Sequence, residues 1–238
     1  MLVLKMKALI LAGGKGTRLL PYTAVLPKPL MPIDETPILE IIIRQLKKYG
    51  ISDIFISVGY MAGLIETFFG DGKRFGVTIT YSVETQPLGT AGPIALIPDF
   101  NSTLLVMNGD VLTSLNYRNF IDYHKKNKAT MTIGMSTQTY QNPLGYVEHD
   151  EYNVITNYVE KPVYQYDVSM GIYMLEPDIV RFIEKGKRLD IPELVNILIA
   201  NNQKVVGYHC DDYWLDMGKP DDYNKVNEDF KKNRSLFL

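Results

Sequence analysis

The amino-acid chain has 238 residues, of which 46% are hydrophobic and 22% charged, and these proportions exclude a disordered, collagen-like or coiled-coil architecture. A chain of this length buries roughly 70–75% of the surface that its unfolded form exposes, which is enough for one large core or two fused lobes. Lys and Arg total 25 against 27 Asp and Glu, so the net charge of −2 lacks the basic excess of nucleic-acid binders, and we expect no nucleic-acid partner.

The first seven residues favour a cytoplasmic protein without a membrane partner. Lysines at positions 5 and 7 interrupt the apolar residues of this segment, which therefore resembles neither a signal peptide nor a membrane span. Cys210 is the single cysteine, so no internal disulfide can form, and no Cys/His cluster has the spacing of zinc ligands. We therefore expect a reducing, cytoplasmic environment.

The N-terminal half begins with the pattern of a buried strand and a helix. A continuous apolar run at residues 8–12 ends at Gly13, as expected for a strand that is buried on both faces and stopped by a turn. A helix is predicted after the following loop, with Thr36 as its N-cap, Pro37 at its first position and Gly50 just past its end.

Further strands are predicted along the chain. Residues 53–58 form the second strand, so that strand, helix and strand predict a right-handed parallel crossover. Residues 77–83 and 103–108 follow as strands. In the second half, strands are predicted at 129–136, 145–149, 154–160 and 168–175, and helices near 176–185 and 191–200. Because no linker or internal repeat separates the halves, we predict a single domain over residues 1–238 with one continuous mixed sheet.

A glycine-rich segment follows the first strand. Residues 11–19 lie where that strand ends, so their backbone N–H groups can converge on an anion. The dinucleotide-binding fingerprint fails, because its third glycine would fall on Leu19, and the Walker pattern fails, because Lys15 is followed by Gly16 rather than Ser or Thr. A glycine turn of this kind is often nothing more than a turn.

Two cations accompany this segment and favour a phosphate-binding role. Arg18 lies within it, and Lys28 stands between Pro27 and Pro29, which restrict the backbone around it.

At these positions the sequence resembles the sugar-1-phosphate nucleotidyltransferases, also called nucleotide-sugar pyrophosphorylases. The resemblance starts with residues 11–19, Pro21, Thr23 and residues 27–29. Further family motifs follow in the same order at residues 88–91, 108–110, 145–147, 159–162, 169–173 and 214–220. So many motifs in one order over most of the chain make coincidence implausible.

The resemblance implies a fold as well as a reaction. The fold is an α/β, Rossmann-like three-layer α/β/α sandwich with a mixed, mainly parallel central sheet and a smaller sugar-binding lobe. Residues 1–112 would be the nucleotide-binding half, and residues 113–238 the sugar-phosphate-binding half with a closing C-terminal helix. Since the motifs run to Gly218, we expect no C-terminal β-helix of the kind found in longer relatives.

The implied reaction needs positive charge rather than a base. A sugar-1-phosphate oxygen attacks the α-phosphorus of a nucleoside triphosphate, and because a phosphate monoester is already largely ionised at neutral pH, the protein supplies positioning and cations. The resemblance implies that Arg18 faces the departing β- and γ-phosphates and that Lys28 lies nearer the α-phosphate. The implied nucleotide-binding residues are Leu11, Ala12, Gly13, Gly14, Gly16, Thr17, Glu84, Gly89, Thr90, Asn108 and Gly109. The implied sugar-phosphate-binding residues are Gly145, Glu160, Lys161, Ser169 and Gly171.

The resemblance also implies a magnesium site at Asp110 and Asp216. Asp110 follows a buried strand and Asp216 follows an aromatic-rich stretch, where a carboxylate is costly without a counter-charge. Mg²⁺ binds through one or two carboxylates together with phosphate oxygens and water. The alternatives are that Asp110 is a turn residue and that Asp216 caps a helix over residues 219–231.

The nucleobase and the sugar are predicted from single positions. Glu84 lies five residues before Gly89, where family members contact the base, and a carboxylate matches the two adjacent donors of guanine better than the mixed edge of uracil or thymine. This favours GTP, with a uridylyl- or thymidylyltransferase acting on another hexose 1-phosphate as the alternative. Mannose 1-phosphate and manno-heptose 1-phosphate are the leading sugars. Ser169 and Met170 stand where the family motif usually has Asn-Ala or Asn-Thr, so the usual hexose contacts of the family are not predicted for this segment.

Two other function classes remain as alternatives. A GT-A type glycosyltransferase would carry an Asp-x-Asp motif, whereas residues 108–110 supply one carboxylate. A non-catalytic nucleotide-sugar sensor would typically lose the cations or the metal carboxylates, all of which are present here. The expected partners are a nucleoside triphosphate and a sugar 1-phosphate, and assembly into a homo-oligomer is compatible with the sequence.

Overall fold

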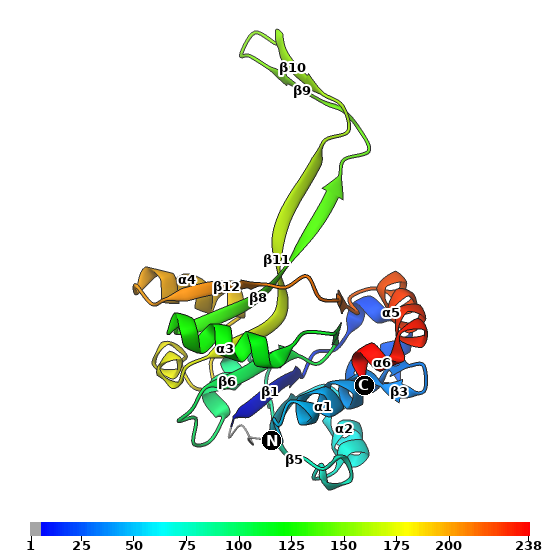
Figure 1. The fold of residues 1–238 in the computed structure, drawn as a ribbon, viewed down its shortest axis with the longest axis vertical. Coiled ribbons are helices and arrows are strands. Elements are labelled where there is room, and N and C mark those ends of the chain that lie inside the picture. Colours follow the sequence, from blue (N-terminus) through cyan, green and yellow to red (C-terminus); the bar gives the residue numbers. More distant parts are fainter. Residues whose placement is uncertain (1–5) are drawn as a thin grey trace.

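The structure is a computed structural model that describes residues 6–238 (Figure 1). The interpretation of the first seven residues rests mainly on residues 1–5, which lie outside the described part. Within the described part, no helix is long and apolar enough to cross a membrane.

A seven-stranded sheet forms the centre of the molecule, in the order β12-β8-β11-β6-β1-β4-β5. Its strands are β1 (Lys7–Ala12), β4 (Asp53–Val58), β5 (Thr78–Val83), β6 (Leu104–Asn108), β8 (Met131–Gln141), β11 (Val163–Leu175) and β12 (Val205–His209). The pairs β1–β4, β1–β6, β4–β5 and β8–β12 are parallel, whereas β11 runs antiparallel to both β6 and β8. The predicted mixed, mainly parallel sheet is confirmed.

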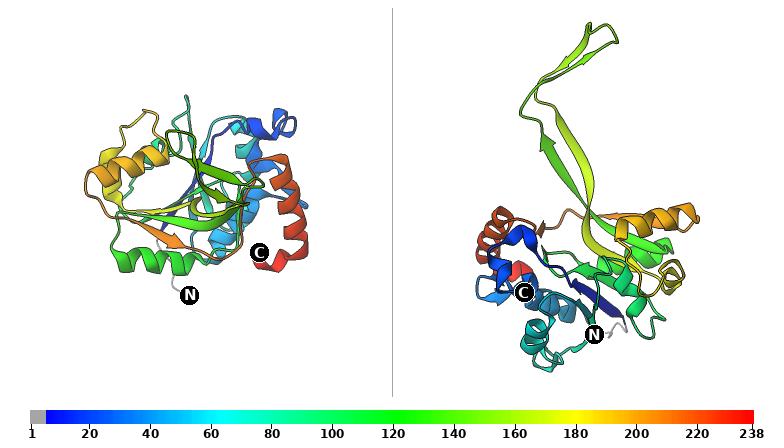
Figure 2. Two further views of the ribbon diagram at one scale, coloured as in Figure 1. Left: turned by 90° about the horizontal axis from the view of Figure 1, so that it is seen from above. Right: turned by 180° about the vertical axis from the view of Figure 1, so that it is seen from behind.

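Helices cover both faces of this sheet and make three layers (Figure 2). One face packs against α1 (Ile38–Lys48), α2 (Ala62–Phe69), α3 (Tyr117–Asn127), α5 (Pro220–Lys232) and α6 (Arg234–Phe237). The other face packs against α4 (Ile191–Ala200) and the 3-10 helices η5 (Gly92–Leu96) and η6 (Pro177–Phe182).

The alternation of β1 explains the two separate cores. Ala8 and Ile10 belong to the first core, while Leu9 between them belongs to the second, and all three are fully buried. Successive side chains of a strand point to opposite faces, so a strand in the middle of a covered sheet is apolar throughout. The three-layer α/β/α sandwich is confirmed, and the described residues contain no β-helix.

The start of α1 differs from the prediction. Thr36 and Pro37 form the short strand β3 (Thr36–Pro37), which pairs antiparallel with β2 (Pro32–Ile33), and α1 begins at Ile38. The extended Pro37 occupies the N-cap position and makes no side-chain cap. The predicted N-cap at Thr36 is therefore wrong, because the pairing of Thr36 with Ile33 keeps this residue in a hairpin.

The smaller lobe expected in the second half takes the form of a long two-stranded arm (Figure 1). β8 and β11 extend beyond their predicted ends and stay paired from Met135–Ser169 to Gln141–Val163. Their ends lead into a second hairpin of β9 (Tyr146–His149) and β10 (Ile155–Val159). We call residues 136–168 the arm. Residues 136–139 of β8 are all polar, and residues 164–167 of β11 alternate tyrosine with polar residues. Neither segment contains an apolar run, which is why the sequence pattern ended both strands early.

Candidate active site

A cavity of about 410 Å³ opens where β1 and β6 end. Every residue predicted to bind the nucleotide lines this cavity, and so do Arg18, Lys28 and Asp110. The complete lining is Leu11, Ala12, Gly13, Gly14, Gly16, Thr17, Arg18, Lys28, Pro29, Glu84, Pro87, Gly89, Thr90, Asn108, Gly109 and Asp110. A crevice outside the carboxyl ends of parallel strands is the usual ligand site of open α/β sheets.

The glycine-rich loop has a conformation that requires Gly16. Gly16 has a φ of 61°, and a Cβ atom there would lie 2.9 Å from the Thr23 methyl carbon. The Thr23 hydroxyl donates to the Gly16 carbonyl at 2.8 Å, and the N–H of buried Leu19 donates to the same carbonyl at 2.9 Å. Two residues outside the cavity lining thus hold the loop, while Gly14, Gly16 and Thr17 of the loop line the cavity.

The ends of β1 and β6 approach each other closely at the cavity floor. The Gly109 N–H donates to the Leu11 carbonyl at 2.9 Å, and a Cβ atom on Gly109 would lie 3.0 Å from that oxygen. Gly171, on β11, has a φ of 71°, and a Cβ atom there would lie 2.5 Å from Asn108 Nδ2. Small residues therefore let three strands meet beneath the cavity.

Glu84 is fixed by hydrogen bonds to both carboxylate oxygens. Ser57 Oγ donates to Oε1 at 2.6 Å, and the Leu88 N–H donates to Oε2 at 2.9 Å. Oε1 would lie 2.8 Å from a Cβ atom on Gly13, so the carboxylate lies against the glycine-rich loop. Each oxygen keeps a further lone pair, which allows the group to accept hydrogen bonds from a ligand.

A second loop of the cavity is tied to the start of α4. The Thr90 N–H donates to Asp190 Oδ1 at 3.0 Å, and the Ile191 N–H donates to the Thr90 hydroxyl at 2.8 Å. Asp190 also forms a capping box with Glu193 at the first turn of α4. Burial opposes ionisation of Asp190, but the hydrogen bonds from Arg188 and Thr90 outweigh it and lower the pKa of this carboxyl group.

Cations and carboxylates meet on one side of the cavity. Lys28 is 9% exposed; its Nζ donates to Asp110 Oδ2 in a short contact and lies 3.8 Å from Asp216 Oδ1. A Cβ atom on Gly218 would lie 3.1 Å from Asp216 Oδ2, 3.4 Å from Arg18 Nη1 and 3.6 Å from an Asp222 oxygen. The predicted charged residues Arg18, Lys28, Asp110 and Asp216 are therefore brought together.

A short antiparallel pair carries Asp216 to Asp110. β13 (Trp214–Asp216) pairs with β7 (Val111–Thr113), and the Met217 N–H donates to the Asp110 carbonyl at 3.1 Å. Helix α5 begins at Pro220 with Lys219 at its N-cap position, so Asp216 is not a helix cap.

The two carboxylates fit a divalent cation. Asp110 Oδ1 and Asp216 Oδ1 are buried and have no hydrogen-bond partner among the described residues. Burial and the neighbouring Asp110 charge raise the pKa of Asp216, while Lys28 and Arg18 oppose the shift. Residues 6–238 contain no group of three or more His, Cys, Asp or Glu side chains suited to a metal. Two carboxylates with free lone pairs match Mg²⁺, which takes its other ligands from phosphate and water.

The predicted sugar-phosphate-binding residues fall into two groups. Ser169 and Gly171 lie at the base of the arm, where Ser169 Oγ accepts from the Gly171 N–H at 3.2 Å and hydrogen-bonds the Tyr173 hydroxyl at 3.0 Å. The Ser169 hydroxyl is thus already engaged within the protein.

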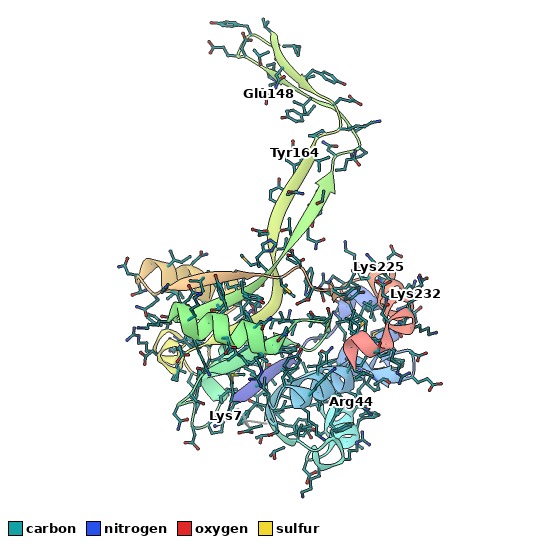
Figure 3. The ribbon with its side chains drawn as sticks, in the orientation of Figure 1. Lys7, Arg44, Glu148, Tyr164, Lys225 and Lys232 are labelled. Carbon is teal, nitrogen blue, oxygen red and sulfur yellow. The ribbon has the colours of Figure 1, made fainter. Side chains whose placement is uncertain are left out.

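Gly145, Glu160 and Lys161 lie far out on the arm. Gly145 contacts Glu160, since a Cβ atom there would lie 2.7 Å from Glu160 Oε2. The structure does not bring these three residues to the cavity of their own chain, since none of them lines it. The labelled neighbours Glu148 on β9 and Tyr164 on β11 both stand well away from the central sheet and its helices (Figure 3).

Some residues of the site escape sequence reasoning. Ser57 interrupts the apolar run at residues 54–58, and this polar residue at a buried position is a usable signal. Asp190 precedes Ile-Pro-Glu, which is a capping-box signature, but its bond to Thr90 has no local signal. Asp222 gave no signal beyond its place in the first turn of α5.

Comparison with known proteins agrees with this geometry. The chain is 34% identical to a UTP–glucose-1-phosphate uridylyltransferase of Synechocystis sp. and 35% identical to a mannose-1-phosphate guanyltransferase of Saccharomyces cerevisiae. Both alignments cover 92% of this chain, and they cover 61% and 63% of the relatives. The chain thus spans about three fifths of the length of these relatives.

Solved structures show the same fold. The chain matches a Bacillus anthracis protein described as a glucose-1-phosphate thymidylyltransferase, in complex with sucrose, with a TM-score of 0.76 and 26% identity over 94% of each chain. It matches HddC from Yersinia pseudotuberculosis with a TM-score of 0.73 and 26% identity over 94% of this chain and 99% of that one, and HddC is also solved in complex with GMP-PN. The family model for nucleotidyl transferases matches residues 7–233. The chain therefore belongs to the nucleotidyl transferase family.

Proposed function

We propose that this chain transfers a nucleoside monophosphate from a nucleoside triphosphate to a sugar 1-phosphate and releases pyrophosphate. The observation that carries this proposal is the cavity, which joins a glycine-rich loop, two cations and a pair of carboxylates with unpartnered oxygens. The names of the relatives, which transfer uridylyl or guanylyl groups to glucose 1-phosphate or mannose 1-phosphate, support it.

The chemistry depends on bringing two polyanions together. The sugar phosphate needs no base, because its second pKa is near 6, so the reaction depends on in-line placement and on charge at the leaving group. Arg18 would bind the departing phosphates, and Lys28, with three donors and one already given to Asp110, would bind nearer the α-phosphate. Mg²⁺ held by Asp110 and Asp216 would neutralise negative charge on the triphosphate.

We propose GTP as the nucleotide. The Glu84 carboxylate is held by Ser57 and Leu88 and lies against the loop, so its remaining lone pairs form a fixed double acceptor suited to the N1–H and N2–H₂ edge of guanine. The mannose-1-phosphate guanyltransferase relatives and the HddC complex with GMP-PN support this choice. Mannose 1-phosphate or manno-heptose 1-phosphate is the proposed acceptor.

A panel of GTP, UTP, dTTP and ATP against mannose, manno-heptose and glucose 1-phosphates tests the proposal, with pyrophosphate release as the readout and EDTA in place of MgCl₂ as a control. We expect release with GTP and a manno-configured sugar phosphate, and none in EDTA. Absence of release from every pair would refute nucleotidyl transfer. Equal turnover with UTP and GTP would refute the choice of base.

Variants test the assigned charges. Arg18→Gln and Lys28→Gln should each lower kcat/KM by about 100-fold or more, since each removes charge stabilisation from the transition state. Lys126→Gln, at an exposed lysine of α3, is the matched control and should keep full activity.

A further inference from the structure

We propose that the arm of one chain docks at the cavity of a second copy of this chain, and that the second arm docks in return. Each cavity would then receive Gly145, Glu160 and Lys161 from the partner chain. This inference rests on the proposed function and on the sugar-phosphate-binding role that the family resemblance implies for those residues.

The arm contacts β12 at its base, where Thr137 and Asp167 lie next to His209, but no other strand of the described chain pairs with it. β12 pairs with β8 as far as His209–Met135, and β6 pairs with β11 from Leu104–Leu175 to Met107–Ile172. Beyond these points β8 and β11 pair with each other alone, and β9 pairs with β10. A two-stranded ribbon with nothing packed against it is marginally stable at best in water. The arm therefore needs a surface to pack on.

The side chains of the arm are suited to burial. Of the eighteen large hydrophobic residues that are exposed in the described chain, ten lie on the arm. They are Tyr140, Leu144, Val147, Tyr152, Val154, Ile155, Tyr158, Val163, Tyr164 and Tyr166. Figure 3 shows that the outer part of the arm, with its side chains, stands apart from the rest of the molecule. Apolar side chains gathered in this way mark an interaction surface.

Exposed apolar side chains also occur close in sequence to residues that line the cavity. Leu20, Tyr22 and Val25 follow Arg18 in the chain and are 54%, 54% and 77% exposed. Val83, next to Glu84, is 55% exposed. These four make up half of the large exposed hydrophobic residues that lie outside the arm in the described chain. The segments next to the cavity-lining residues Arg18 and Glu84 therefore carry exposed apolar side chains that a docked arm would cover.

The geometry of the arm directs it to another molecule. It begins at a register shift between Ser169 and Tyr173, which contains Gly171 in a left-handed conformation. From Ser169 to Val163 the ladder with β8 is continuous, and six residues of strand advance by about 20 Å. Lys161 lies beyond that ladder, so the unbroken pairing carries it away from its own cavity.

Reciprocal exchange also closes the assembly. When each of two copies gives an arm and receives one, the contact is isologous and produces a dimer instead of a filament. Both arms are then covered. The cavity that lacks Gly145, Glu160 and Lys161 within its own chain is completed by the partner copy.

Complementation in a mixed dimer tests the exchange. Asp110→Asn removes a carboxylate from the cavity, and Lys161→Gln removes the cation from the arm. Each homodimer should have less than about 1% of wild-type turnover. The two variants are co-expressed with different tags, and the mixed dimer is isolated on both tags in turn. Exchange unites the intact body of one chain with the intact arm of the other, so the mixed dimer should recover about half of wild-type turnover. If each arm serves its own cavity, both sites stay defective and no turnover returns, which would overturn the proposal.

A cross-linking experiment tests the exchange without reference to activity. In a Cys210→Ser background, Thr17→Cys at the cavity of one chain and Lys161→Cys on the arm of another are joined by a short bis-maleimide. We expect a covalent dimer of the two differently tagged chains. A wild-type chain that sediments as a monomer, or the absence of this cross-link, would overturn the inference even if nucleotidyl transfer is found. Formation of the cross-link together with no pyrophosphate release by the wild-type chain would instead refute the proposed function while the exchange stands.

Discussion

Replacing Lys28 with Met should destabilise the protein in the absence of metal and make it more responsive to Mg²⁺. Met keeps most of the side-chain volume, so the change removes charge rather than packing. Lys28 is the cation that hydrogen-bonds Asp110 and lies 3.8 Å from Asp216. Without it, two neighbouring carboxylates with unpartnered oxygens repel each other, and Arg18 remains as the cation beside Asp216.

The magnitude follows from the burial of the three side chains. Removing one partner of a fully buried ion pair costs about 3–5 kcal/mol. Here the side chains of Lys28, Asp110 and Asp216 are 11%, 21% and 37% exposed, so solvent reduces the penalty and we expect about 2 kcal/mol. For a chain of this size, that loss corresponds to a melting temperature lower by about 4–8 °C.

Thermal unfolding in EDTA and across a MgCl₂ titration measures both effects. A cation that binds the folded state at 100 times its Kd adds about 2.7 kcal/mol, so saturating Mg²⁺ should restore most of the loss. The gain should be larger in the variant than in the wild type, because Lys28 competes with the metal for Asp110. A Lys28→Met protein that melts like the wild type in EDTA, or gains no more from Mg²⁺, would refute the reasoning. In the double variant with Asp110→Asn, the two losses should not add.

Other predictions concern the cavity and the core. Gly171→Ala should lower the free energy of unfolding by about 1–2 kcal/mol because of its left-handed backbone, and should raise the KM for nucleotide by displacing Asn108. Gly186→Ala, with a φ of 81° but open space around it, is the control and should show the stability loss alone. Equal nucleotide KM values for the two variants would contradict this reasoning. Asp190→Ala should cost about 1 kcal/mol through the lost cap of α4 and raise the nucleotide KM, both readable from melting curves and kinetics. Burial raises the pKa of Cys210 to about 11, so at pH 8 this thiol should be alkylated about 100-fold more slowly than in urea, as followed by mass spectrometry; fast labelling of the native protein would contradict it.

The interior of the fold could be predicted from the sequence because its signals are local. Strand β4 and helix α4 have the predicted bounds, since each is an apolar segment set between clear start and stop residues. The helix predicted at residues 176–185 is a shorter 3-10 helix over Pro177–Phe182. The prediction of a helix N-cap at Thr36 is wrong, because a capping residue next to a proline is also compatible with a hairpin strand.

In the candidate active site, too, the residues in local motifs could be predicted, whereas contacts between distant parts of the sequence could not. The nucleotide-binding residues were predicted from motifs and do line one cavity, although their binding role stays a prediction. The hydrogen bond between Thr90 and Asp190 joins residues 100 positions apart, and no local sequence pattern near either residue predicts it. The full length of the two arm strands could not be predicted either. A two-stranded ribbon that is exposed on both faces lacks the alternation of apolar and polar residues by which strands are recognised.

Because Asp216 lies at the end of β13, the two carboxylates of the candidate metal site come together at different stages of folding. Asp110 follows β6 in the N-terminal half, while its partner arrives through a strand formed near the end of the described chain. Contacts between residues so far apart in sequence form late, because a long loop must close first. During synthesis, the glycine-rich loop and Lys28 would be in place before Asp216 leaves the ribosome, so a nascent chain could hold phosphate well before it could hold the metal through both carboxylates.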